Sequence, residues 1–330
     1  KEAYVEMKYG RSLLTLLFFL CISGTMCTAT PVNISFATWA FSGPDMDAVQ
    51  ATVRGFMELN PDIVVDVQQV PCCNEAVTEA YIVQIAGGKG PDLMQIPFAC
   101  FADMAAAGML LPLDDLIARD ARSVDPADVF PAAWEAVTYQ GRRYGMPYDL
   151  SAQWMAFVPQ NFEEAGLEGP ISTYKRGAWT WGTLRDVARK ITQRDADGQL
   201  KRVGMVIQYN ELLGQPWLYQ TGSSPFAPDL GEARFTDPAV IQAFRFLHDM
   251  QHQDRTSKEA WSEPIADPNQ GQFGVWPQWL SIPYYFKGAS FTTDIVPAPE
   301  GPVGQVTTGQ IHAIAVWNGS PHPEAAWKYA

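Results

Sequence analysis

Histidine, cysteine and basic residues, which mark many functional sites, are scarce in this chain. Its 330 residues include 4 histidines and 5 cysteines, and 23 basic residues face 36 acidic ones, so the formal net charge is -13. A phosphate-backbone partner requires a basic face, so this charge argues against nucleic-acid binding. The sequence also lacks the Cys-x-x-Cys spacing of zinc sites and the Gly-x-Ser-x-Gly elbow of many hydrolases. We therefore expect no metal and no cofactor.

A hydrophobic run long enough to cross a bilayer is also missing. The apolar stretch Leu13–Ile22 is too short to span, and it lies between basic residues and a small, polar segment. This layout is typical of a secretory signal peptide that begins at Met7 and is cut near Ala29. Residues 1–29 are therefore predicted to be a signal peptide, with residues 1–6 as upstream translated sequence, and the mature protein to be periplasmic or extracellular.

The predicted export has consequences for the cysteines and the charge. Cys21 and Cys27 follow Leu20 and Met26, which are not small residues, so a lipid anchor is disfavoured. Cleavage removes one net positive charge and leaves -14. It also leaves three cysteines in an oxidising compartment, where thiols tend to pair. A bridge from Cys72 or Cys73 to Cys100, a ring between the two neighbours and free thiols all stay open.

The mature chain opens with alternating strand and helix patterns. Strands are predicted at 32–39, 63–70 and 91–96, and helices at 45–60 and 78–86. In the first helix, Val49, Val53, Phe56 and Met57 recur at helical spacing. Strands alternating with helices form right-handed βαβ units, so a parallel sheet covered on both faces is expected. At 330 residues the chain is long for one core, which favours two lobes.

Motifs in a fixed order give the chain a family resemblance. They are Trp39 at the end of the first strand, Asn60-Pro61-Asp62-Ile63, Gly90-Pro91-Asp92-Leu93, the segment 107–116, the hairpin 139–148, Ala165-Gly166-Leu167, Trp179-Thr180-Trp181, the aromatic stretch 272–286, Val296-Pro297-Ala298-Pro299 and the segment 321–327. Together they resemble the extracellular solute-binding proteins of ABC sugar importers, family 1, the group that includes the maltose-binding protein. Each motif alone is weak, and the signal comes from their order across residues 31–330.

The resemblance implies an α/β fold of the periplasmic-binding-protein type II, with two lobes joined by hinge segments and a ligand cleft between them. Lobe 1 would hold residues 31–146 and 306–330, and lobe 2 residues 147–304. The sequence stops at Ala330 inside an expected helix, and family members continue for several helices. We therefore expect the C-terminal part to be missing here.

The same resemblance implies a function without catalysis. The protein would bind a sugar or oligosaccharide as a monomer and deliver it to the transmembrane permease subunits of an ABC transporter. A secreted glycoside hydrolase or polysaccharide lyase is the alternative, because such enzymes also line a cleft with aromatic rings. Release of reducing ends from a glycan would identify the enzyme.

The stretch 272–286 carries six aromatic residues and no charge. Pro277 and Pro283 exclude a regular helix, which favours an exposed loop. Flat rings stack well on the apolar faces of sugars, so Trp276, Trp279 and Tyr284 are predicted to contact the ligand. A buried aromatic cluster beneath a loop is the competing interpretation.

Further ligand residues follow from the rule that ligands of α/β lobes sit at the carboxyl ends of strands. The predicted contacts are Trp39, Gln95, Tyr148, Asp149, Glu211 and Trp217. The two carboxylates would accept hydrogen bonds from sugar hydroxyls. A core role for Trp39, a turn amide for Gln95, solvated carboxylates and a partly structural Trp217 are the alternatives.

Two apparent metal motifs have simpler explanations. His248 and His252 are four residues apart in a helical pattern, but without the intervening glutamate of metalloproteases, so a solvated face is favoured. The run Asp195-Ala196-Asp197-Gly198 resembles the start of a calcium loop, but the later ligand positions do not fit, and a turn is predicted.

Overall fold

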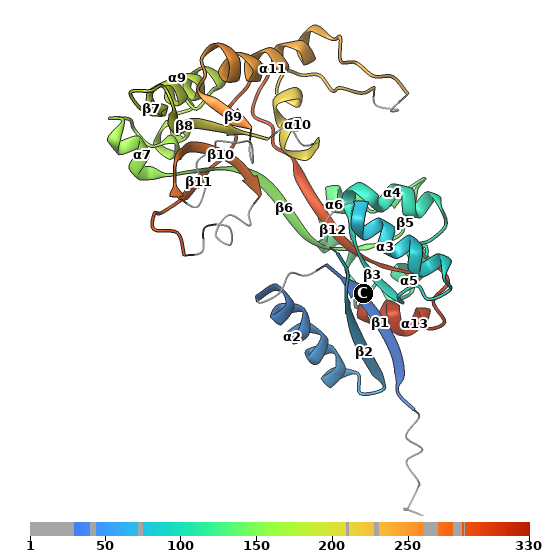
Figure 1. Cartoon of the computed structure of the whole chain (residues 1–330). Coiled ribbons are helices and arrows are strands. Elements are labelled where there is room, and N and C mark those ends of the chain that lie inside the picture. The colour runs from blue at the N-terminus through green and yellow to red at the C-terminus, as the bar shows by residue number, and fades with distance from the viewer. Residues whose placement is uncertain are drawn as a thin grey trace, which may run out of the picture. The chain divides into compact units, whose positions relative to one another are not determined.

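The structure is a computed structural model, and it describes residues 30–39, 44–71, 75–208, 211–227, 231–259, 270–279, 286 and 288–330. The predicted signal segment, residues 1–29, lies outside these ranges, and so do Cys72 and Cys73. The described residues form two compact units, the first ending at Met146 and resuming at Ala313, and the second running from Pro147 to His312 (Figure 1). The sequence predicted the first unit to end at residue 146 and to resume at residue 306, whereas it resumes at Ala313.

Unit 1 begins with the predicted alternation of strands and helices. Its elements up to the boundary are β1 (Val32–Thr38), α2 (Pro44–Leu59), β2 (Ile63–Gln69), α3 (Glu75–Ala86), β3 (Leu93–Pro97), α4 (Phe98–Ala106), α5 (Asp114–Arg119), η1 (Pro126–Asp128), α6 (Pro131–Ala136), β4 (Thr138–Tyr139) and β5 (Arg142–Arg143). Strand β1 lies between β2 and β3 and is parallel to both. Five elements predicted from residue 32 to residue 96 are thus confirmed, within a few residues at their ends.

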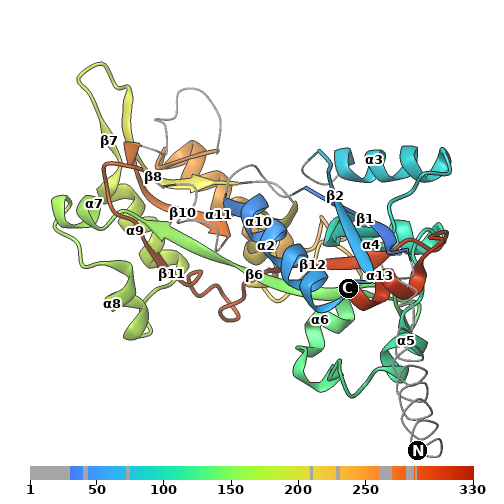
Figure 2. The ribbon, with the colours of Figure 1, turned by 90° about the horizontal axis from the view of Figure 1, so that it is seen from below.

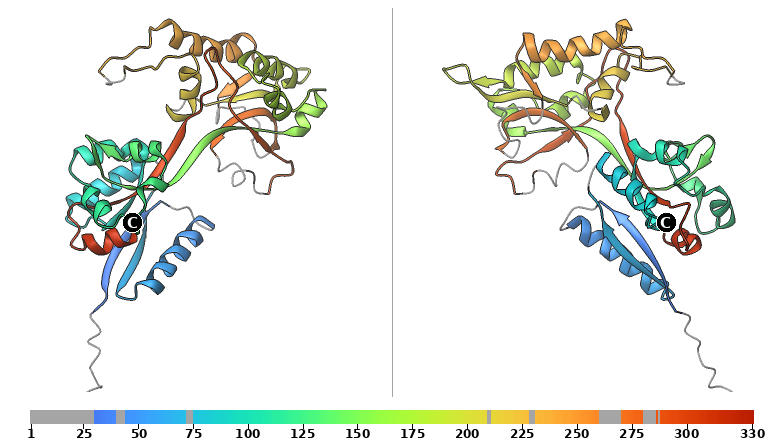
Figure 3. Two further views of the ribbon diagram at one scale, coloured as in Figure 1. Left: turned by 180° about the vertical axis from the view of Figure 1, so that it is seen from behind. Right: turned by 45° about the vertical axis from the view of Figure 1, so that its right-hand side comes forward.

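The core of unit 1 explains why these segments adopt their structures. In α2, Val53 is buried, and Val49, Phe56 and Met57 pack against the core, so the helix presents one apolar face to the sheet. Figure 3 shows α2 beside the paired strands β1 and β2. The helix ends before Asn60-Pro61, where proline disfavours a helical preceding residue. Helix α13 (Pro323–Tyr329) completes unit 1 and buries Trp327 in this core.

Unit 2 is a mixed sheet with helices around it. Its elements are β6 (Met146–Phe157), α7 (Pro159–Glu164), α8 (Pro170–Lys175), α9 (Trp181–Ile191), β7 (Gln193–Arg194), β8 (Leu200–Ile207), α10 (Glu211–Tyr219), α11 (Pro238–His248), the π-helical turn η2 (Asp249–Gln253), β9 (Ser257–Glu259), β10 (Phe273–Trp279), β11 (Asp294–Val296) and β12 (Gly309–Val316). Strand β10 is antiparallel to β6 and parallel to β8 (Figure 2). The chain passes between the units along β6 and β12.

Helix α9 lies very close to the sheet of unit 2. The side chain of Thr180 caps the helix by accepting a hydrogen bond from the amide of Thr183. A methyl group on Gly204 of β8 would lie 2.2 Å from the carbonyl oxygen of Ala188 in α9. Only glycine at this strand position allows the helix backbone to approach so closely.

Within the described ranges, no helix is both long and apolar enough to cross a membrane. The predicted turn at Asp195 is confirmed, because its carboxylate accepts hydrogen bonds from the amides of Asp197 and Gln199. Cys100 is buried in unit 1. Its predicted bridge to Cys72 or Cys73 stays a prediction, because both of those residues lie outside the described ranges.

Candidate functional site

At the carboxyl ends of β1 and β3, unit 1 brings together two of the predicted ligand residues. The amide oxygen of Gln95 accepts hydrogen bonds from the hydroxyl of Thr38, at 2.5 Å, and from the backbone amide of Trp39, at 3.3 Å. The buried hydroxyl of Tyr81 donates to the carbonyl oxygen of Gln95 at 2.7 Å. These bonds fix the backbone that carries the half-buried indole of Trp39. The edge therefore presents an indole and an amide in a defined arrangement.

Near its start, strand β6 carries a second pair of predicted residues. Tyr148 is exposed and stacks on His312 of β12, with ring centroids 6.1 Å apart. Both carboxylate oxygens of Asp149 lie 2.9 Å from Nδ1 of His312, and one accepts from its backbone amide at 3.2 Å. His312 is absent from the predicted site, because neither its strand nor the position of that strand beside β6 follows from local sequence patterns.

Further along β6, amide and indole groups surround a small cavity of about 10 Å³ in unit 2. The cavity is lined by Gln153, Trp154, Met155, Pro216, Trp217, Gln220, Pro277 and Ala298. The buried indole N–H of Trp154 has no hydrogen-bond partner within the described structure. Since buried polar groups almost always have partners, this N–H is suited to donate to a ligand or a water molecule. Trp154 and Gln220 are absent from the predicted site, although Gln220 lies only three residues after the predicted Trp217.

The described first part of the aromatic stretch, residues 273–279, forms the strand β10 and not the exposed loop that Pro277 predicted. Pro277 lies within β10 opposite Met155 of β6, and the pairing with β8 extends only from Phe273 to Val275. The missing amide of Pro277 is tolerated because that side of the strand has no ladder partner there. The prediction failed because a proline excludes a helix but not a strand position whose amide faces no partner strand.

Two of the predicted ligand tryptophans are core residues. Trp276 is 1% exposed and contacts Phe273 and Phe286, with ring centroids 5.7 and 6.0 Å away. This burial corrects the expectation that Trp276 faces a ligand, and favours the competing interpretation of an aromatic core. Trp217 is 4% exposed and packs against Trp181 and Phe246, so it is a core residue with one edge on the small cavity.

The remaining predicted residues have different outcomes. Trp279 is half-buried at the end of β10, opposite Gln153 of β6. Glu211 begins helix α10, but its side chain lies outside the described structure, and so does Tyr284 altogether. The contacts predicted for those two residues stay predictions.

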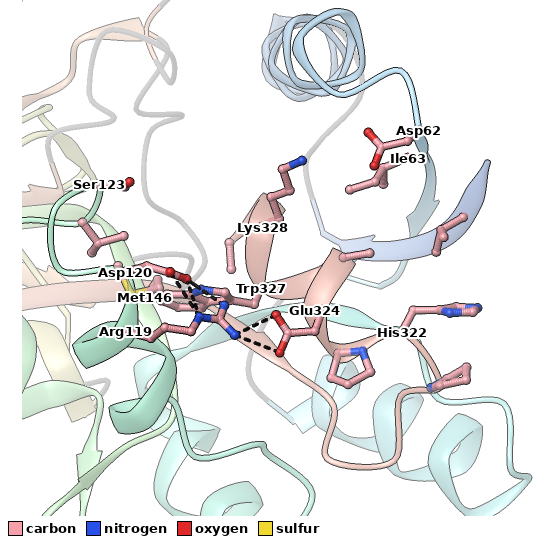
Figure 4. Close-up of a pocket in the computed structure, with 16 residues that line it drawn as sticks. Asp62, Ile63, Arg119, Asp120, Ser123, Met146, His322, Glu324, Trp327 and Lys328 are labelled. Atoms are coloured by element: carbon pink, nitrogen blue, oxygen red, sulfur yellow. Dashed lines mark hydrogen bonds and ion pairs between the residues drawn. The ribbon is translucent and has the colours of Figure 1, made fainter. Parts of the chain in front are cut away.

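A larger cavity of about 790 Å³ lies in unit 1, but away from the edge that carries Trp39 (Figure 4). It includes Val32 and Ile63, the first residues of β1 and β2, and so lies at the amino ends of the strands. There Arg119 binds both Asp120 and Glu324. The hydrogen bonds from Arg119 and from the indole of Trp327 lower the pKa of Asp120. Because Arg119 already pairs with Asp120 and Glu324 inside it, we assign this cavity a structural role.

Potential metal ligands do not cluster anywhere in the described ranges. The rings of His248 and His252 lie 4.7 Å apart at the junction of α11 and η2. His248 contacts the carboxylate of Asp249 at 3.4 Å, so this face of the helix carries polar contacts between neighbouring residues.

Comparison with known proteins places these features in a family. The profile of the bacterial extracellular solute-binding proteins matches residues 41–330. The ABC substrate-binding protein from Listeria monocytogenes, solved in complex with cycloalternan, is 26% identical with a TM-score of 0.78 over 91% of this chain and 74% of that one. The sugar-binding protein MalE from Xanthomonas citri is 22% identical, with a TM-score of 0.72 over 90% and 74%.

A curated relative adds a partial sequence match. The maltotriose-binding protein of Pyrococcus abyssi is 27% identical over 203 residues, which cover 62% of this chain and 40% of that protein. The solved structures share the two-lobe α/β fold of periplasmic binding proteins, as the sequence analysis predicted. The family profile covers most of the chain, so this protein belongs to the bacterial extracellular solute-binding proteins, the family whose sugar-binding members include the maltose-binding protein.

Proposed function

We propose that the protein binds a sugar or oligosaccharide and delivers it to the permease of an ABC transporter. The observation that carries this proposal is a half-buried tryptophan beside a glutamine at the end of a strand in each unit: Trp39 beside Gln95, and Trp279 opposite Gln153. An indole face stacks on the apolar C–H groups of a sugar ring, and an amide both donates to and accepts from its hydroxyls. Two family relatives are described as bound to cycloalternan or as binding maltotriose, which supports this class of ligand.

Each proposed ligand contact has a distinct role within its own unit. In unit 1, Trp39 supplies a stacking surface and Gln95 fixes its backbone. In unit 2, Trp279 supplies a second surface, and the N–H of Trp154 donates a hydrogen bond. Asp149, already oriented by His312, accepts from a sugar hydroxyl.

The proposed mechanism is a shift in population and not catalysis. A ligand that binds one arrangement of the two units better than others increases the population of that arrangement, which the permease then recognises. The extracellular family supports an exported protein that works outside the cytoplasm. Its family relatives are binding proteins, and an enzymatic role finds no support among them.

A ligand screen tests this proposal. Thermal unfolding of the protein is followed with mono- and oligosaccharides, including maltose and maltotriose, because a ligand that binds only the folded state raises the melting temperature. Affinity is then measured by calorimetry for the wild type, Trp39→Ala and the control Phe130→Ala, which removes an exposed ring at the start of α6.

The expected result is saturable binding of at least one sugar, lost in Trp39→Ala and kept in Phe130→Ala. Absence of binding across the panel, or equal loss in both variants, would refute the proposed function. The reaction mixtures are also assayed for new reducing ends. Their release from a glycan would favour a secreted hydrolase.

A further inference from the structure

Unit 2 contains a second polar cavity, of about 470 Å³, that shares no lining residue with the proposed sugar site. Three segments form it: the end of β7, the turn from η2 to residue 255, and the strand β9. Its lining consists of Arg194, Gln251, His252, Arg255, Ser257, Lys258 and Glu259. Strand β9 pairs with the second half of β8, and β7 pairs with its first half, so β8 holds these segments together.

The charge of this cavity is opposite to that of the whole chain. Three cationic side chains and one carboxylate line it, a formal excess of two positive charges in a protein of net charge -13. The guanidinium of Arg194 donates to the carbonyl oxygens of Gly198 and Arg255, each at 3.0 Å. Carbonyl groups hold this cation in place without neutralising it. Among the ion pairs of the described residues, none includes Arg194 or Arg255.

The backbone at Arg255 is held in an uncommon conformation. Its φ of 55° lies in the left-handed region, which non-glycine residues seldom adopt. The π-helical turn η2 precedes it, and the amide of Thr256 donates back to the carbonyl oxygen of Met250 at 2.8 Å. This hydrogen bond and the one that Arg194 donates to the carbonyl oxygen of Arg255 fix the backbone from which the Arg255 side chain extends.

Ser257 gives a second, independent indication of a ligand. It is 4% exposed, and its hydroxyl has no hydrogen-bond partner in the described part of the chain. A buried hydroxyl without a partner loses the hydrogen bonds that it would make with water, so such groups usually have one. Ser257 lines a cavity that cationic side chains also line.

We propose that this cavity binds a tetrahedral oxyanion of the phosphate or sulfate class, either free or carried by a larger molecule. Cationic groups that come from three chain segments suit an anion with oxygens in several directions. Arginine is especially suited to such groups because its planar N–H donors match their oxygens. Ser257 donates a further hydrogen bond. This inference does not rest on the proposed sugar binding.

The experiment is calorimetric titration of the full chain with inorganic phosphate and with sulfate, and with acetate as a planar anion. Glucose 6-phosphate and glucose, titrated in parallel, distinguish a free anion from a phosphate carried by a sugar. One saturable site for phosphate or sulfate is expected, with weaker binding of acetate. The affinity falls as sodium chloride is added, because the site is accessible to solvent ions.

Charge-matched variants separate the site from the general charge of the protein. Arg255→Gln removes one cation from the cavity and is expected to weaken the anion about tenfold or more. Arg234→Gln removes one exposed cation elsewhere in unit 2 and leaves the affinity unchanged. If Arg255→Gln does not fold, Lys258→Gln takes its place. Absence of saturable binding, or an equal effect of both variants, overturns the proposal.

Ser257→Ala tests the buried hydroxyl. Because that hydroxyl has no partner in the described protein, its removal leaves the melting temperature without anion unchanged or higher. The affinity for the anion falls at the same time. A lower melting temperature with unchanged anion affinity would show that the hydroxyl supports the fold, and would overturn its assigned role.

Discussion

Trp276 and Trp279 lie three residues apart in β10, and their substitution by alanine should have opposite effects. Trp276 is 1% exposed and sits in a cluster with Phe273 and Phe286, so its removal leaves a cavity in the core of unit 2. Large-to-small substitutions of buried aromatic residues cost about 3–5 kcal/mol of folding free energy. Trp276→Ala is therefore expected to lower the stability of unit 2 by this amount.

Trp279→Ala should instead affect the ligand. This residue is half-buried at the end of the strand, opposite Gln153, and the proposed function gives it a stacking role. Loss of a buried aromatic contact at a binding site costs about 2 kcal/mol, or roughly 30-fold in affinity. Its effect on unfolding should be much smaller than that of Trp276→Ala, because it leaves a smaller cavity.

The assay combines urea unfolding, followed by circular dichroism, with calorimetric titration of a sugar found in the ligand screen. The two units need not unfold together, so the transitions are fitted separately where two are seen. Folded Trp276→Ala should bind the sugar with nearly wild-type affinity. Strong destabilisation by Trp279→Ala with unchanged affinity, together with a stable Trp276→Ala that no longer binds, would refute this assignment.

Two further predictions concern the stability of unit 2. Hydrogen bonds from Arg185 and Arg189 lower the pKa of the largely buried Asp254. The folded state therefore gains stability from the ionised Asp254 above the ordinary Asp pKa of about 3.9, and loses it as the pH falls to the lowered pKa. Asp254→Asn should lower the free energy of unfolding by about 1–3 kcal/mol near pH 7. In urea unfolding, the difference in stability between the variant and the wild type should shrink in acid. A difference that stays constant with pH would contradict the role of the charge. Gly204→Ala would place a methyl group 2.2 Å from the carbonyl oxygen of Ala188 and should cost about 3 kcal/mol in the same assay, whereas the control Gly182→Ala, whose methyl group meets only Thr180 at 3.7 Å, should be tolerated.

Local chemistry explains why the first half of unit 1 could be predicted from sequence. The apolar spacing of Val49, Val53 and Phe56 specifies one buried helix face, whatever that face packs against. Asn60-Pro61 and Gly87-Gly88 end their helices through backbone restrictions that act over a few residues. Thr180 caps α9 for an equally local reason.

The aromatic stretch shows where local chemistry was insufficient. Side chains of Trp276 and Trp279 are chemically identical, and sequence gave no reason to bury the first and leave the second half-exposed. Their difference arises from β6 and β8, which lie on either side of β10. Pro277 correctly indicated that no helix forms here. Whether a strand tolerates the proline depends on whether a neighbouring strand would accept a hydrogen bond at that position.

The candidate sites depend on contacts between residues far apart in the chain. Trp39 and Gln95 could be placed together because both stand at the carboxyl ends of parallel strands, a consequence of the βαβ order itself. His312 reaches Asp149 only because β12 returns beside β6, and Arg194 reaches Arg255 only because β7 and β9 both pair with β8. The sequence by itself thus determined the first elements of unit 1 and the family, which rest on local periodicity and motif order. The tertiary structure decided which rings are buried and which charges meet, because burial and pairing depend on the neighbours that folding supplies.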